Sequence, residues 1–164
     1  MAKAKTMTVL KNPNQELRKI SSPVQLKDVA TPTMQELVNT LKATMKKENG
    51  VGIAAPQVGI HERVIIAETE AGPTAFINPE IIETSFKMVD SEEGCLSVPG
   101  VWGVVQRHRS VKVKALNEQA EEVVLKANGL LAIIFQHEID HLNGILFIDR
   151  AEKVQPTNGK QVSV

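Results

Sequence analysis

The spacing of hydrophobic and polar residues predicts two helices of different character. Between residues 31 and 50, apolar residues recur every three or four positions, as in an amphipathic helix. Thr31 can cap its first turn, Pro32 suits its first position, and Asn49 with Gly50 ends it. Residues 129–142 have hardly any polar face, so we expect this second helix to be buried through the middle of the domain.

Short β-branched or alternating runs predict the strands. The runs are 64–67, 74–77, 81–84, 87–90, 110–116 and 121–125. The second should stop at Asn78 and Pro79, and the last two should pair across a turn at 117–120. These elements predict an α+β fold, with mixed or antiparallel strands around one buried helix and an N-terminal helix packed outside. We expect a single domain over residues 1–150 and a polar, flexible tail over 151–164.

Composition and charge narrow the classes of function. Lys+Arg and Asp+Glu both number 19, so no strong field is available to hold nucleic acid or anionic lipid. Aromatic residues make up only 3%, which leaves few stacking platforms for single-stranded nucleic acid. The lone cysteine excludes an internal disulfide, and no apolar run approaches the roughly 18–20 residues of a membrane span. Without a signal-peptide core, a cytoplasmic enzyme or binding domain is expected.

Polar residues return in the second half of the buried helix, where burial is costly without partners. His137 and His141 are four positions apart, so both rings can reach one metal ion from the same helix face. Glu138 can reach a water on that metal without binding the metal itself, which is the His-Glu-x-x-His pattern of metal-dependent hydrolases. The alternative is a pair of core histidines satisfied by other polar groups.

A catalytic metal normally has three protein ligands, and the third is not found downstream. Position 147 is Phe147, and the polar end of the chain offers poor candidates. Cys95 alone would be a small buried hydrophobe, but beside two unmatched histidines it becomes the candidate third ligand. One thiolate and two imidazoles suit Zn²⁺. His61 and His108 lie in charged stretches and are interpreted as solvated surface residues.

Three motifs in this order resemble the signature of the peptide deformylase family. They are Gly50-x-Gly52-x-Ala54-Ala55-x-Gln57, Glu93-Gly94-Cys95-Leu96-Ser97 and Gln136-His137-Glu138-x-Asp140-His141. The similarity extends over roughly residues 8–150. It implies an enzyme that removes the N-formyl group from the initiator methionine of nascent bacterial polypeptides and releases formate. Its partners would be formylated nascent peptides, with no direct nucleic-acid or membrane partner, and we expect a monomer.

The resemblance also implies the roles of the site residues. The cysteine and the two histidines would bind one divalent metal, natively Fe(II), with Ni, Co or Zn as substitutes. The metal lowers the pKa of a bound water, and Glu138 would take its proton as hydroxide attacks the formyl carbon. The side-chain amide of Gln57 and the backbone N–H of Leu96 would stabilise charge on the formyl oxygen. Without this context, Gln57 would be an ordinary polar loop residue.

Recognition of methionine needs an unbranched apolar slot. Residues in position to line it lie on the helix turns before His137 or near its rim: Leu130, Ile133, Ile134, Ile53 and Glu93. Plain core packing is the alternative for the apolar ones. An extended peptide could add as a strand along Gly50 and Gly52. Asp140 and Arg107 are candidates to fix an imidazole tautomer or the loop after the cysteine.

The sequence departs from the family pattern at two places. Some members have a long C-terminal helix that docks on the ribosome, whereas residues 151–164 are short and polar, so a transient ribosome contact would need another route. Arg107 follows Gln106 instead of the usual proline.

Two other functions compete with a deformylase: a zincin-type peptidase and a non-catalytic binding module on the same fold. The missing downstream ligand argues against the first, and retention of the whole residue set argues against the second.

Overall fold

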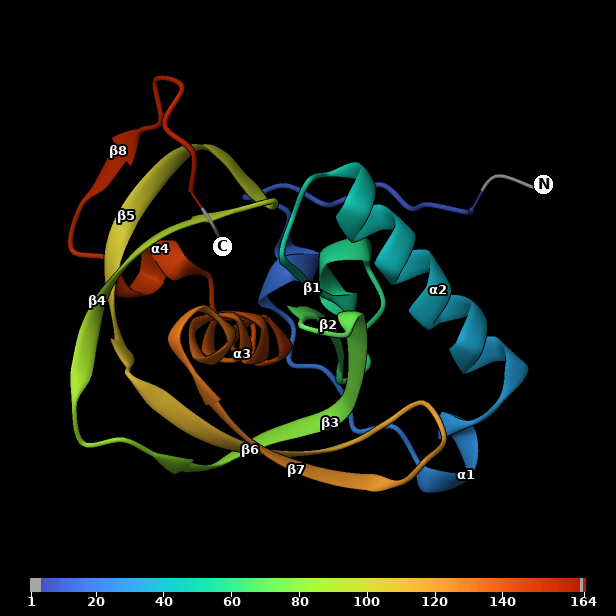
Figure 1. The fold of residues 1–164 in the computed structure, drawn as a ribbon. Coiled ribbons are helices and arrows are strands. Elements are labelled where there is room, and N and C mark those ends of the chain that lie inside the picture. Colours follow the sequence, from blue (N-terminus) through green and yellow to red (C-terminus); the bar gives the residue numbers. More distant parts are fainter. Residues whose placement is uncertain (1–3, 163) are drawn as a thin grey trace.

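Two antiparallel sheets enclose one central helix in the computed structural model, which describes residues 4–162 and 164 (Figure 1). The five-stranded sheet has the order β1 (Gly52–Ala54), β2 (Val64–Thr69), β3 (Gly72–Thr84), β6 (Ser110–Leu116) and β7 (Glu122–Asn128). The three-stranded sheet has the order β4 (Met88–Cys95), β5 (Val98–His108) and β8 (Val154–Pro156). The predicted α+β fold with antiparallel strands is confirmed.

Both predicted helices are present. Helix α3 (Gly129–Leu142) lies between the two sheets, and α2 (Pro32–Lys47) packs on the outer face of the five-stranded sheet (Figure 1). Thr31 caps α2 as expected, because its side chain accepts the N–H of Met34. The remaining helices are single turns: η1 (Gln15–Arg18), α1 (Leu26–Val29), η2 (Ala55–Val58) and α4 (Phe147–Arg150).

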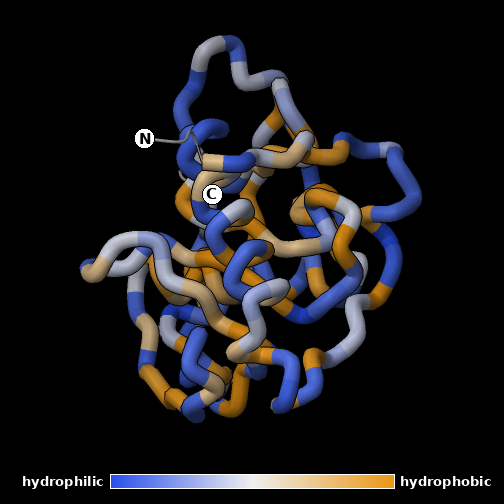
Figure 2. The backbone as a smooth tube through the Cα atoms, turned by 90° about the vertical axis from the view of Figure 1, so that its right-hand side faces the viewer, coloured by the Kyte–Doolittle hydropathy of each residue, from blue (hydrophilic) through white to orange (hydrophobic). Residues whose placement is uncertain are grey.

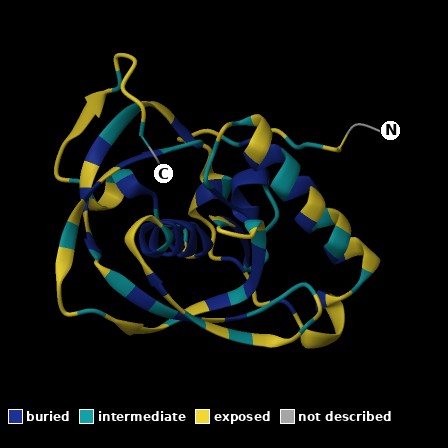
Figure 3. Ribbon diagram, viewed as in Figure 1, coloured by how far each residue is buried: buried dark blue, intermediate teal, exposed yellow. Residues whose placement is uncertain are grey.

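Strand β2 shows why the sheet accepts a helix on each face. Successive side chains of a strand point to opposite faces. Val64 and Ile66 therefore pack with α2, whereas Ile65 and Ala67 pack with α3. Both faces are buried, so the strand is a continuous apolar run rather than an alternating one. The dark blue centre of Figure 3 shows the result for α3, which is buried from Ala132 to its last residue.

Strand β3 corrects one prediction, because Asn78 and Pro79 do not end it. They form a bulge, where the register with β6 shifts between Ile77 and Glu80. Asn78 adopts a φ of 52°, and its side chain exchanges two hydrogen bonds of 2.8 Å with the backbone of Val24. A bulge tolerates proline because its residues leave the hydrogen-bond ladder.

Strands β1, β5 and β8 were not among the strands predicted from the sequence. Arg107 lies on the buried face of β5 beside Val105, while Val104 on the other face is 41% exposed, so polar and apolar residues do not separate cleanly between the two faces. Strand β8 lies within the predicted tail and pairs with β5, so this part of residues 151–164 belongs to a sheet. Apolar stretches along the backbone are short (Figure 2), and among the described residues no helix is long and apolar enough to cross a membrane.

Candidate metal centre and active site

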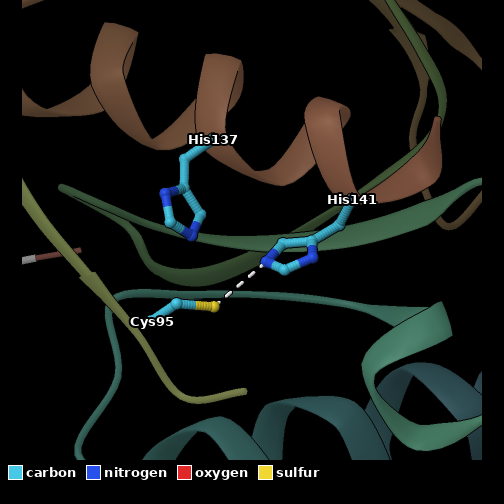
Figure 4. A group of neighbouring side chains, drawn as sticks. All are labelled: Cys95, His137 and His141. Atoms are coloured by element: carbon cyan, nitrogen blue, oxygen red, sulfur yellow. Dashed lines mark hydrogen bonds between the residues drawn. The ribbon is translucent and has the colours of Figure 1, made fainter. Parts of the chain in front are cut away.

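Three metal-ligating side chains converge between the end of β4 and helix α3. Cys95 is the last residue of β4, and His137 and His141 project from successive turns of α3 (Figure 4). One donor atom from each lies within 4.8 Å of the other two, and Cys95 Sγ is 3.3 Å from His141 Nε2. Both histidines are buried. The structure therefore brings together the three ligands predicted from the sequence.

This donor set fits a divalent transition metal. Two imidazoles and one thiolate are common ligands of such ions, and three protein ligands leave a coordination position free for a reactant. Burial lowers the pKa of His141 well below its usual value, which keeps the ring in its neutral, metal-binding form. Burial also lowers the pKa of His137, but hydrogen bonds to Cys95 and Glu93 outweigh this and raise it to about 10. The surroundings of His137 thus favour positive charge.

A buried ion-pair network holds His137 in place. Glu93 is fully buried, and its Oε1 accepts a 2.8 Å hydrogen bond from His137 Nδ1. Arg107 donates two further hydrogen bonds of 2.8 Å to the same carboxylate and one of 2.7 Å to Asp140. Arg150 reaches Asp140 from the other side. Because Nδ1 is engaged by Glu93, His137 directs Nε2 toward the other two donors.

The charge of Glu93 is secured by this network. Burial alone would raise its pKa, but the hydrogen bonds from Arg107 and His137 lower it to about 2. The sequence predicted Glu93 at the rim of a methionine slot, and Asp140 and Arg107 as the residues that fix the imidazole. In the structure Glu93 makes the contact with the imidazole, and Arg107 holds Glu93.

Glu138 points into a cavity of about 260 Å³ beside the three donors. Its Oε2 atom is buried, and no described residue forms a hydrogen bond with it. Burial raises the pKa of Glu138 to about 7. A carboxyl group with this pKa can both accept and return a proton near neutral pH.

Gly52 makes room for Glu138. A Cβ atom at position 52 would lie 2.6 Å from Glu138 Oε1 and 2.9 Å from Ile134 Cγ2. Contacts this short do not occur between packed atoms, so only glycine fits here without displacement of the carboxylate.

Gln57 is oriented by its own carbonyl group. Its Oε1 accepts the backbone N–H of Ala54 at 2.9 Å, which turns the NH₂ group toward the cysteine. Nε2 lies 3.7 Å from Cys95 Sγ and donates to Ser97 Oγ at 3.1 Å. Leu96 lines the same cavity, and its carbonyl accepts a hydrogen bond from Lys11 Nζ at 2.7 Å. The contacts of Ser97 and Lys11 were not foreseen, since neither residue is close in sequence to its partner.

The residues predicted to bind substrate lie in different surroundings. Gly50 and Gly52 line the cavity that holds Glu138. Ile53 and Ile134 are buried in the core, and Leu130 is 48% exposed near the start of α3. Ile133 lines a separate cavity of about 440 Å³, together with Val89 and Ser91 of β4 among other residues.

Two histidines outside the site differ from their predicted state. His61 and His108 are half-buried rather than solvated. His61 Nε2 lies 2.6 Å from Glu16 Oε2, and His108 Nδ1 lies 2.9 Å from the carbonyl oxygen of Ser85. Both rings therefore form polar contacts within the fold.

Comparison with known proteins agrees with this arrangement. The family model of polypeptide deformylase matches residues 6–157. Peptide deformylase from Carboxydothermus hydrogenoformans is 50% identical over 138 residues, which cover 84% of this chain and 88% of the relative. A ligand-bound class I type b peptide deformylase from Acinetobacter baumannii superimposes with a TM-score of 0.87 at 45% identity, over 89% of this chain and 99% of that one. The deformylase from Thermotoga maritima gives a TM-score of 0.86 at 38% identity, over 90% and 99% of the two chains. The chain belongs to the polypeptide deformylase family.

Proposed function

We propose that this protein hydrolyses the N-formyl group from the N-terminal formylmethionine of nascent polypeptides and releases formate. The observation that carries the proposal is the convergence of Cys95, His137 and His141 next to the cavity that Glu138 lines. Membership of the deformylase family supports the substrate class.

Cys95, His137 and His141 would hold one divalent metal. When bound, the metal would act as a Lewis acid that makes a water molecule more acidic and a carbonyl carbon more electrophilic. Donor chemistry alone favours Zn²⁺, whereas resemblance to the family favours Fe(II), with Ni or Co as substitutes. Metal analysis of protein purified without oxygen distinguishes these ions.

Glu138 would carry the proton through the reaction. Its buried Oε2 would take a proton from the attacking water and return it to the amine that leaves. A pKa of about 7 suits both transfers. Glu93 and Arg107 act through His137: they fix which nitrogen faces the ligand cluster, and so they position a ligand without touching substrate.

Gln57 and Leu96 would stabilise the negative charge that develops on the formyl oxygen. The NH₂ group of Gln57 is already turned toward Cys95, so no reorientation is needed during the reaction. The backbone N–H of Leu96 would supply the second donor from the cavity wall. One such donor is typically worth about 2.7–4 kcal/mol of barrier.

The peptide would bind along the glycine segment that leads into β1, where Gly50 and Gly52 permit close backbone approach. The methionine side chain would enter the cavity lined by Ile133, which lies one helical turn before His137 on the same helix face. Leu130 continues this face by about one more turn and is half-exposed. These two side chains would form the apolar wall of the slot.

The setting in the cell is proposed from the substrate. Formylated chains emerge from the ribosome in the bacterial cytoplasm, so we propose that the protein acts there as a monomer in transient contact with ribosomes. Sedimentation of the protein with and without ribosomes tests both the oligomeric state and the contact.

A formate-release assay with metal analysis tests the function. Anaerobically purified protein should release formate from formyl-Met-Ala-Ser and hold about one metal per chain. Glu138→Gln should lose 10²- to 10⁴-fold in kcat and keep its metal, whereas Cys95→Ala should lose the metal as well. Glu121→Gln, at an exposed carboxyl group on the turn before β7, is the matched control. Cleavage of unformylated peptide without formate release would instead identify a peptidase.

A further inference from the structure

The segment after β8 returns to the candidate active site. From β8, at the upper left of Figure 1, the chain turns back toward α3 and β1. Thr157, Lys160, Gln161, Val162 and Val164 all line the cavity that holds Glu138. The glycine segment at 50–52 lines the same cavity. The chain's own polar end therefore lies where a bound peptide has to pass.

One backbone group at the edge of this cavity is already taken by the segment. The N–H of Gly94 donates a 3.0 Å hydrogen bond to the main-chain oxygen of Val164. Gly94 falls at the irregularity of the β4–β5 pairing, between Glu93 and Cys95, so it is not one of the paired positions of the ladder. Val162 packs against the same glycine, with its Cβ 3.5 Å from the position that a Cβ of Gly94 would occupy. A main-chain oxygen of the segment thus occupies the N–H of the residue that directly precedes Cys95.

The contacts that hold the segment are weak and lie on the surface. Lys160 Nζ is 3.1 Å from Glu92 Oε2 and 3.7 Å from the centre of the Trp102 ring. The N–H of Thr157 donates to the carbonyl of Gly100 at 3.0 Å. Exposed ion pairs and cation–π contacts contribute little individually, so an incoming chain can displace the segment.

We propose that residues 157–162 and 164 are an internal occupant of the peptide cleft, which residues beyond the methionine of a substrate must displace. The proposal rests on the proposed deformylase function. An extended peptide and this segment compete for the backbone N–H of Gly94 and for the space beside it. Substrates that end at the methionine do not meet the segment, so the device discriminates between substrates by their length.

A change at Lys160 tests this competition. In Lys160→Met, the KM for a five-residue peptide beginning formyl-Met-Ala-Ser should fall on the order of three- to ten-fold, because one ion pair and one cation–π contact are lost. Its kcat should stay within about two-fold, and the KM for formylmethionine amide should not change. Lys153→Met is the matched control, since Lys153 lines a different cavity. Glu92→Gln removes the same ion pair from the other side and should reproduce the fall in KM.

An unchanged or raised KM for the long peptide in Lys160→Met would overturn the proposal. The segment would then have no effect on peptide binding, or it would contribute to it. Hydrogen exchange of the Gly94 amide gives a readout that needs no catalysis. The amide should be protected in the parent protein and exchange faster in Lys160→Met, but not in Lys153→Met. Equal exchange in all three proteins would refute the occupancy. If no protein releases formate but exchange at Gly94 changes as expected, the proposed function fails and the occupancy stands.

Discussion

Replacement of Gly52 by alanine tests whether the position of Glu138 governs the rate. The added Cβ would lie 2.6 Å from Glu138 Oε1 and 2.9 Å from Ile134 Cγ2, both inside normal contact distance. Ile134 is buried in the core, so the carboxylate has to move. The backbone itself accepts alanine, because Gly52 does not have a positive φ.

The size of the effect follows from these distances. An ordinary contact is about 3.4 Å or more, so the Oε1 atom must shift by close to 1 Å. A misplacement of about 1 Å typically costs around 10²-fold in rate. We expect kcat for formyl-Met-Ala-Ser to fall by 10- to 100-fold, or about 1.4–2.7 kcal/mol of barrier. Overpacking should also cost about 1–3 kcal/mol of unfolding free energy, which leaves the domain folded.

The assay combines steady-state formate release, metal analysis and urea unfolding. Gly50→Ala is the comparison variant: its Cβ would meet the side chain of Leu96 at 3.0 Å and the backbone oxygen of Gly52 at 3.4 Å but not Glu138, so it should raise the KM for the peptide more than it lowers kcat. The double variant Gly52→Ala/Glu138→Gln should be no slower than Glu138→Gln alone, since both changes remove the same proton transfer. Normal kcat in Gly52→Ala, or fully additive losses in the double variant, would refute this reasoning.

Three further predictions concern stability. Removal of the metal by a chelator should lower Tm by roughly 5–15 °C in calorimetry, because an ion held by the three ligands would link β4 to α3; an unchanged Tm would argue against a shared site. Arg107→Met leaves the buried carboxylate of Glu93 without its cation and removes one of the two arginines at Asp140, so it should cost about 3–5 kcal/mol in urea unfolding, whereas Lys114→Met, at an exposed pair, should cost under about 1 kcal/mol. Burial opposes the charged form of Asp149, but the hydrogen bond from Arg18 lowers its pKa, so its stabilisation is present above about pH 4 and lost as pH falls through the lowered value. The stability difference between the parent protein and Asp149→Asn, about 0.5–1 kcal/mol at pH 6 for this exposed pair, should therefore shrink toward pH 3, and a difference that grows there would contradict the assigned direction.

Local patterns predicted the parts of the fold that local physics determines. The bounds of α3 and the cap of α2 followed from periodicity and end residues, because capping and apolar spacing act within one or two turns. The three metal ligands could be predicted for the same reason. Two histidines share one helix face, and the lack of a third ligand downstream pointed to the single cysteine.

Features that depend on distant partners could not be predicted in this way. Strand β5 buries Arg107, whose partners Glu93 and Asp140 lie on β4 and α3. A buried arginine in a strand cannot be predicted without knowledge of these distant carboxylates. The turn predicted at Asn78 is a bulge because Val24, far away in the sequence, satisfies its side chain. Strand β8 carries no apolar signal, since its residues are exposed and it is held by pairing with β5.

Helix α3 is enclosed on all sides from Ala132 onward, whereas the cavity beside it is lined largely by three surface segments at 48–52, 94–101, and 157–162 with 164. Substitutions on the helix disturb packing and chemistry together, so few of them can be neutral. Apart from Gly52, Cys95 and Leu96, the residues of these surface segments can vary with little effect on the ligand cluster. In this family, preference for one nascent chain over another can therefore diverge between species while the reaction stays the same.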